Sequence, residues 1–288
     1  MSPAITIDWT NKYGIHEFGY LVKPTNHKLG VHYPLVVVTE DCRGFLRGGQ
    51  GHEYPIQVFA ANGFAVLCSG LLAGARRVPP SGNFEETLMR WKVPMASLET
   101  ATKMLTDMGV VDPRRKGLTG LSYGAEVTSF TISHSDLFQA AITSSGSGRD
   151  PIFYYFANNF WHQQFVQWGL GGIPEGKTSK SWQELSPALN AERVKAPLLI
   201  QSADSEYLLG LQFYTALKEL DKPVEFFIYA DEGHIKNHPK HRFEIYERNL
   251  DWFNFWLQDK EDPDRAKADQ YTRWRELKKL QEKKVLSQ

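Results

Sequence analysis

The sequence predicts an α/β fold, with a mostly parallel central sheet and helices on both faces. Short apolar, β-branched runs alternate with longer runs of helical periodicity along most of the 288 residues. Some of the short runs, such as YPLVVVTE (33–40), are apolar at almost every position, which is typical of parallel strands covered on both faces. An apolar content of 42% and a charged content of 23% are ordinary for one large soluble domain.

The predicted elements follow one another in strand–helix order. A half-exposed strand at 17–24 and a buried strand at 33–40 come first, and a helix over 53–63 then ends at a glycine. Residues 84–108 have one long helical pattern, in which Pro94 is expected to cause a kink. Further strands are expected at 64–70, 116–121, 139–146, 196–203 and 224–231, with helices at 125–133, 214–220 and 242–257.

Two segments do not fit this alternation. Residues 151–190 are rich in aromatic side chains and too long for a simple crossover, so they indicate either a cap-like excursion over a site or a helical excursion without such a role. Residues 263–288 are highly charged and are expected to form a solvated helix. The predicted organisation is one domain over 1–262, with the excursion inside it, followed by a charged helical tail over 263–288.

Charge and cysteine content narrow the classes of function. The formal net charge is +0, from 33 basic and 33 acidic residues, which favours neither nucleic acid nor a membrane as a partner. The apolar runs are too short to span a bilayer, and no signal peptide is visible, so a cytoplasmic location is expected. Two cysteines, Cys42 and Cys68, are too few for a disulfide scaffold or a cysteine metal site, and Cys68 is interpreted as a small buried hydrophobe.

The stretch GLSYG (120–124) matches the pattern G-x-S-x-G. A short strand runs directly into it and a helix follows directly, which is the setting of a strained turn that exposes a nucleophilic serine. Small residues two positions before and after the serine leave room for such a turn. Ser122 is therefore the candidate nucleophile, and the backbone N–H of Tyr123 is the candidate donor to an oxyanion.

A serine hydroxyl needs a base, and in this fold the acid and then the histidine follow it along the chain. His234 comes directly after the last apolar strand, whereas His238 and His241 flank Pro239 at the start of a helix and are expected to be exposed. His234 is therefore the candidate base. Either Asp204 or Glu206, in the loop after 196–203, has the carboxylate that would orient the imidazole.

Three stretches resemble the catalytic domain of prolyl-oligopeptidase-type serine peptidases, which have the α/β-hydrolase fold. They are VVDPRRKGLTGLSYGAE (110–126), LSPALNAERVKAPLLIQSAD (185–204) and KPVEFFIYADEGH (222–234). The resemblance runs from about Trp9 to Leu257. Within that family, several stretches look most similar to lasso-peptide isopeptidases. They are RGFLRGGQGHEYPI, LIQSADSEYL, HRFEIYERNLDWFNFWL and the tail containing RWR.

This resemblance implies the roles of particular residues. It gives Ser122 as nucleophile and His234 as general base. The place of the usual family aspartate holds Ser205, whereas isopeptidase-like members use a glutamate that matches Glu206, so Glu206 is favoured over Asp204. The family's tyrosine donor to the oxyanion has no match at 39–43, and a backbone N–H within 40–45 is expected to replace it.

The resemblance also implies an activity. The expected reaction is hydrolysis of a peptide or isopeptide amide through an acyl-enzyme, with no cofactor and no metal; an esterase using the same triad is the alternative. Family members usually carry a β-propeller before this domain, so such a propeller is a candidate further domain of the protein.

Two other patterns compete with the serine motif. GGIPEGKT (171–178) fits a phosphate-binding loop, but such a loop must follow a buried strand, and the residues before it have a helical pattern. His234, His238 and His241 resemble a metal cluster, but the glutamate of zinc-peptidase helices is missing and Pro239 disrupts a shared helical face. Neither a nucleotide site nor a metal site is therefore predicted.

Overall fold

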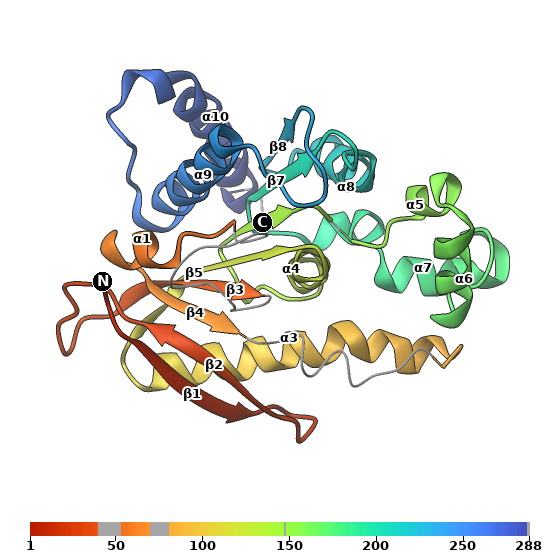
Figure 1. The fold of residues 1–288 in the computed structure, drawn as a ribbon, viewed down its shortest axis with the longest axis horizontal. Coiled ribbons are helices and arrows are strands. Elements are labelled where there is room, and N and C mark those ends of the chain that lie inside the picture. The colour runs from red at the N-terminus through yellow and green to blue at the C-terminus, as the bar shows by residue number, and fades with distance from the viewer. Residues whose placement is uncertain (40–52, 70–80, 147, 287–288) are drawn as a thin grey trace.

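The computed structural model describes residues 1–39, 53–69, 81–146 and 148–286. Their strands form one sheet of eight in the order β1-β2-β4-β3-β5-β6-β7-β8 (Figure 1). The two pairs that involve β2 are antiparallel and the others are parallel, which confirms the predicted fold class. The strands are β1 (Ala4–Thr10), β2 (His16–Val22), β3 (Tyr33–Thr39), β4 (Ala65–Ser69), β5 (Val111–Leu121), β6 (Ala140–Ser144), β7 (Leu198–Ala203) and β8 (Val224–Tyr229).

Helices cover both faces of the sheet (Figure 1). Leu35 and Val37 of β3 pack in the cluster that holds the core of α3 and α4, whereas Val36 and Val38 pack with α1 and α9 on the other face. Successive side chains of a strand point to opposite faces, so a strand buried on both sides has to be apolar throughout. The helices are α3 (Phe84–Asp107), α4 (Tyr123–His134) and α8 (Leu208–Glu219) on one face, and α1 (Ile56–Ala61), α9 (Pro239–Gln258) and α10 (Ala268–Leu286) on the other.

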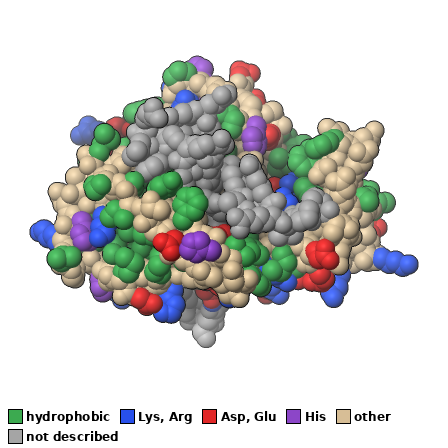
Figure 2. Space-filling view, turned by 60° about the horizontal axis from the view of Figure 1, so that its bottom comes forward, with side chains coloured by type: hydrophobic (Ala, Val, Ile, Leu, Met, Phe, Trp, Pro, Cys, Tyr) green, Lys and Arg blue, Asp and Glu red, His purple; other side chains and the backbone are tan. Residues whose placement is uncertain are grey.

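The edge strand β1 is not among the strands that the sequence predicts. The alternation in AITIDWT is the signal that indicates it. Acidic and basic side chains are mixed on the face that carries β1, β2 and α3 (Figure 2), in keeping with the formal net charge of +0. Within the described part of the chain, every helix is too short or too polar to cross a membrane.

The aromatic-rich excursion folds as short helices between β6 and β7. We call residues 151–185 the insertion; it contains α5 (Pro151–Phe156), α6 (Asn159–Gln167), η1 (Gly176–Thr178) and α7 (Ser179–Leu185), and η2 (Ala188–Arg193) follows it. Phe165 and Trp182 of the insertion are buried in the same cluster as Leu88 and Trp91 of α3. The insertion is therefore packed against α3 through its own aromatic core.

The C-terminal helix α10 is not the solvated helix that its charge suggests. Tyr271, Trp274 and Leu277 are buried, and the Trp274 ring lies 5.0 Å from that of Trp252 in α9. These three positions are spaced three residues apart, so they form one apolar stripe on α10. The composition of the segment does not reveal this stripe, because arginine and lysine are abundant around it.

A second difference concerns Cys68, which is buried in β4 but disulfide-bonded, so its interpretation as a simple buried hydrophobe is incomplete.

Candidate active site

Ser122 occupies a strained turn between β5 and α4. Its φ of 57° and ψ of −121° fall in a region that residues other than glycine rarely adopt. Such a conformation costs about 1–3 kcal/mol and persists only where its surroundings enforce it. The Ser122 N–H donates to the Ser144 carbonyl over 3.0 Å, which continues the pairing of β5 with β6 into the turn.

The two glycines of the motif are required by close backbone contacts. A Cβ on Gly124 would lie 1.8 Å from the Thr39 carbonyl oxygen, and one on Gly120 would lie 2.4 Å from the Gly124 carbonyl oxygen. The Thr39 hydroxyl donates towards the carbonyls of Thr119 and Gly124, each over 3.0 Å, and so joins the end of β3 to the underside of the turn. The sequence-based expectation of small residues here thus has a specific steric cause.

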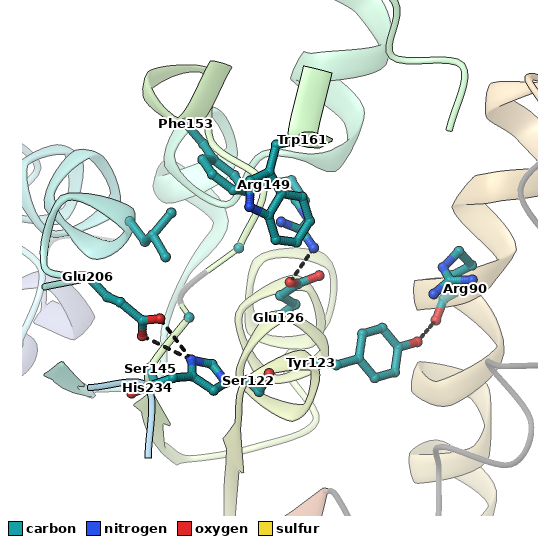
Figure 3. A pocket seen from close by; sticks show the side chains of 13 residues that line it. Arg90, Ser122, Tyr123, Glu126, Ser145, Arg149, Phe153, Trp161, Glu206 and His234 are labelled. Atoms are coloured by element: carbon teal, nitrogen blue, oxygen red, sulfur yellow. Dashed lines mark hydrogen bonds and ion pairs between the residues drawn. The ribbon is translucent and has the colours of Figure 1, made fainter. Parts of the chain in front are cut away.

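His234 and Glu206 form a hydrogen-bonded pair beside the serine. Nδ1 of His234 lies 2.9 Å and 3.0 Å from the two carboxylate oxygens of Glu206. Glu206 comes from the turn after β7, and His234 comes from the loop after β8. Figure 3 shows the imidazole between the Glu206 carboxylate and Ser122. Because Nδ1 is occupied by the carboxylate, Nε2 is the nitrogen left for another partner.

Asp204, the alternative acid, has a different contact. Its carboxylate accepts the backbone N–H of Asp231 over 2.8 Å, and Asp231 has a φ of 55°. Asp204 therefore joins the turn after β7 to the turn after β8 and supports a left-handed residue there. The imidazole of His234 is paired with Glu206 instead.

The loop that carries His234 is fixed in part by a buried carboxylate that sequence reasoning missed. Glu232 accepts the N–H groups of Asn237 and His238 over 2.8 Å and 3.0 Å. It also contacts Nδ1 of His241 over 2.9 Å. The carboxylate of Glu232 thus closes the loop onto the start of α9.

A buried ammonium, also missed by sequence reasoning, fixes the same loop to the sheet. Lys236 is 1% exposed, and its Nζ lies 3.1 Å from a Glu53 oxygen and donates to the Ser144 hydroxyl over 2.6 Å. No local pattern indicates that this lysine is buried, because its carboxylate partner is far away in the sequence.

A cavity of about 560 Å³ opens beside the serine. Ser122, Glu206 and His234 line one side of it, and Phe153 and Trp161 from the insertion line another (Figure 3). The further lining residues are Arg90, Tyr123, Glu126, Ser145, Gly146, Gly148, Arg149 and Leu209. The structure thus brings all three favoured site residues together with the aromatic excursion.

A buried ion pair forms part of the cavity wall. Arg149 lies 2.7 Å from a Glu126 oxygen, and its guanidinium is 4.6 Å from the ring centroid of Trp168 and 5.0 Å from that of Trp161. Burial raises the pKa of the Glu126 carboxyl, while the positive charges of Arg149 and then Arg90 oppose that rise. The ion pair therefore gives this wall a polar centre surrounded by aromatic rings.

The remaining predicted features also have definite outcomes. The region expected to supply the second oxyanion donor, 40–45, lies outside the described residues. GGIPEGKT follows α6 and a turn rather than a buried strand, so it lacks the setting of a phosphate-binding loop. His238 is exposed, as expected, while His241 is half-buried against Glu232.

Comparisons with known proteins identify the family of this chain. The family model described as the prolyl oligopeptidase family matches residues 55–260. The chain is 40% identical over 284 residues to the lasso peptide isopeptidase AtxE2 of Asticcacaulis excentricus, covering 95% of this chain and 40% of that protein. It is 25% identical over 266 residues to the uncharacterized peptidase YuxL of Bacillus subtilis, covering 86% of this chain and 38% of that protein.

Solved structures give the same result. The apo structure of the AtxE2 isopeptidase superposes with a TM-score of 0.86 at 37% identity, covering 97% of this chain and 44% of that chain. A Pyrococcus horikoshii acylaminoacyl peptidase matches the fold with a TM-score of 0.70 at 22% identity, covering 92% of this chain and 44% of that chain. The chain spans less than half the length of these relatives. From the family match and this likeness together, the chain belongs to the prolyl oligopeptidase family of serine peptidases.

Proposed function

We propose that this chain hydrolyses a peptide or isopeptide amide bond through an acyl-enzyme on Ser122. The observation that carries the proposal is the His234 imidazole, which is held by both oxygens of Glu206 and lies beside a serine in a strained strand–helix turn. Those are the parts that acyl transfer requires: a nucleophile, a base, and a carboxylate that orients the base.

The reaction has two halves. As the Ser122 oxygen attacks the substrate carbonyl carbon, Nε2 of His234 takes the hydroxyl proton, and the negative charge gathers on the carbonyl oxygen. The imidazolium then gives that proton to the leaving nitrogen, and the carbon–nitrogen bond breaks to leave an ester on Ser122. Water attacks this ester while Nε2 accepts its proton, and return of the proton to the serine oxygen releases the carboxylic acid.

Two groups around the reacting atoms have distinct roles in this scheme. Glu206 keeps the proton of neutral His234 on Nδ1, so that Nε2 faces the serine as an acceptor. The N–H of Tyr123 stands in the first turn of α4, where helix N–H groups have no acceptor within the helix. It is therefore the donor proposed for the oxyanion.

The proposed substrate class is a peptide with an isopeptide bond between its N-terminal amine and an Asp or Glu side chain. Support comes from the relative named a lasso peptide isopeptidase and from a solved AtxE2 variant described with Astexin3-dC4 bound, which is 36% identical with a TM-score of 0.85. The insertion would act as a cap whose Phe153 and Trp161 hold apolar parts of the peptide. The esterase alternative is not favoured, because these relatives are peptidases.

Hydrolysis of three matched substrates tests the proposal. One peptide carries the isopeptide bond, the second has the same sequence with an ordinary amide, and the third is a small acyl ester of similar chromophore. Wild-type protein is expected to hydrolyse the isopeptide with the highest kcat/KM, and Ser122→Ala is expected to lose all three activities. Activity that survives in Ser122→Ala, or that a chelator removes while a fluorophosphonate does not, would contradict the triad.

A further inference from the structure

A proline inside α3 deprives one helix carbonyl of its usual donor. Pro94 has no N–H, and in an α-helix the group that this N–H would bind is the carbonyl four residues earlier, that of Arg90. Helix α3 nevertheless runs unbroken from Phe84 to Asp107. The carbonyl of Arg90 therefore needs a donor from elsewhere in the fold.

Tyr123 supplies that donor. Its hydroxyl donates a hydrogen bond to the Arg90 carbonyl oxygen, as the dashed line in Figure 3 marks. The Arg90 guanidinium lies 5.9 Å from the centroid of the same ring. Burial raises the pKa of the Tyr123 hydroxyl, so the group stays protonated and keeps its donor character at neutral pH.

Tyr123 is also the residue that follows the candidate nucleophile. Its backbone N–H is the proposed oxyanion donor, and its ring is attached to that same backbone through only two side-chain torsions. The turn is thus held at two ends: the Ser122 N–H binds the Ser144 carbonyl on the sheet side, and the Tyr123 hydroxyl binds α3 on the helix side.

We propose that Pro94 and Tyr123 form a positioning pair, in which the proline withdraws the helix donor from the Arg90 carbonyl so that the tyrosine hydroxyl can anchor the oxyanion-binding turn to α3. This inference rests on the proposed function, since it assigns a purpose to the orientation of the Tyr123 N–H. Pro94 and Tyr123 are positioning residues through their side chains, and neither side chain touches the reacting atoms.

The test compares Tyr123→Phe, Pro94→Ala and the double variant, with Tyr13→Phe as a matched control on an exposed tyrosine of the β1–β2 turn. Two quantities are measured for each: the midpoint of urea unfolding and the second-order rate of labelling by a fluorophosphonate. A phenyl ring at position 123 would retain the packing of the tyrosine, so only the hydrogen bond is removed.

The proposal predicts that the effects of these substitutions on stability and on labelling rate can be separated. Tyr123→Phe takes the hydroxyl donor away from the Arg90 carbonyl and lowers the unfolding midpoint. It also slows labelling by about tenfold, since losing an oxyanion donor outright costs about 10²–10³-fold and a misaligned donor keeps part of its effect. In the double variant the backbone N–H of the new alanine binds the Arg90 carbonyl, so the midpoint recovers while labelling stays about tenfold slow. Tyr13→Phe is expected to match the wild type in both measurements.

The opposite results would contradict the proposed role of Pro94 and Tyr123. If the double variant regains both its midpoint and its labelling rate, the tyrosine only satisfies a carbonyl and positions nothing. If Tyr123→Phe labels at the wild-type rate, the anchor has no role in the reaction. The unfolding measurements test the pair even if the wild type does not react with the fluorophosphonate. If Tyr123→Phe lowers the midpoint equally with proline and with alanine at position 94, the proposed role of the pair is contradicted. A lack of wild-type labelling, by itself, counts only against the proposed function.

Discussion

The serine turn and the histidine loop are held in place by different forces. The turn is fixed by exclusion of volume, since Gly124 leaves no room for a Cβ against the Thr39 carbonyl. The loop is fixed by buried charge, with Lys236 paired to Glu53 inside the protein. Gly233, next to the base, has open space where a Cβ would be added. Close packing thus acts on the nucleophile in addition to the hydrogen bonds of its turn, whereas the loop of the base is held by polar contacts.

This difference should be visible first as a contrast between two glycine substitutions. Gly124→Ala forces a backbone shift at the junction of β3 and α4, and we expect it to lower the free energy of unfolding by about 5 kcal/mol or more, an exceptional loss for one methyl group. Gly233→Ala should change it by less than about 1 kcal/mol, because its φ is ordinary and the space is open. Urea denaturation measures both, and similar losses would show that the turn is not held by packing.

Removal of the buried ammonium tests the polar side of the comparison. Lys236→Met leaves Glu53 buried without its counter-charge, and we expect a loss of about 3–5 kcal/mol. Adding Glu53→Gln should recover part of this loss, because the uncompensated charge is then gone. The measurement is a double-mutant cycle on the free energy of unfolding. Additive losses would contradict the role of this ion pair.

The buried carboxyl of Asp150 should make stability depend on pH. Burial raises the pKa of Asp150 to about 6, against the hydrogen bonds from the Ser186 hydroxyl and the Ala188 N–H, which lower it. Between pH of about 4 and 6 the unfolded chain loses this proton and the folded chain keeps it, so stability falls as pH rises, by about 3 kcal/mol in total.

The comparison variant is Asp150→Asn, whose side chain cannot titrate. The difference in free energy of unfolding between wild type and this variant should decrease over that pH range and stay constant above it. A difference that instead increases as pH rises over the same range would mean that the folded state favours the charged carboxylate.

The smallest expected effect concerns the insertion. Trp161→Ala removes an apolar wall of the cavity, and we expect KM for a peptide substrate to rise about tenfold with kcat little changed. Val166→Ala, on the same helix but 61% exposed and outside the cavity lining, is the matched control and should keep the wild-type KM. Equal changes in both would remove the insertion from substrate binding.

The contrast also explains which parts of the site the sequence predicts. The turn is local: strand, serine, helix and two glycines are adjacent in GLSYG, so their joint requirement can be recognised within one short stretch of residues. The fold class can be recognised in the same way, because apolar strands such as β3 carry the mark of burial on both faces.

The contacts that complete the site are long-range, and no pattern encodes them. Lys236 meets Glu53, and Arg149 meets Glu126, across separations that periodicity does not record. From residue types alone, Asp204 and Glu206 are equivalent candidates; the hydrogen bond of Asp204 to the Asp231 N–H is a property of two loops brought together by the sheet. Trp274 is hidden for another reason, since its buried stripe lies among charged residues that dominate the composition of α10.

The most direct measurement is the rate of fluorophosphonate labelling for the wild type, Ser122→Ala, Glu206→Gln and Asp204→Asn, each first shown to be folded. We expect labelling of the wild type, none of Ser122→Ala, and a loss of about 10³-fold in Glu206→Gln, because the imidazole loses the carboxylate that fixes its tautomer. Asp204→Asn should remain within about threefold of the wild type, since its contact is with a backbone N–H. Labelling of Ser122→Ala, or a large loss in Asp204→Asn with none in Glu206→Gln, would contradict the account.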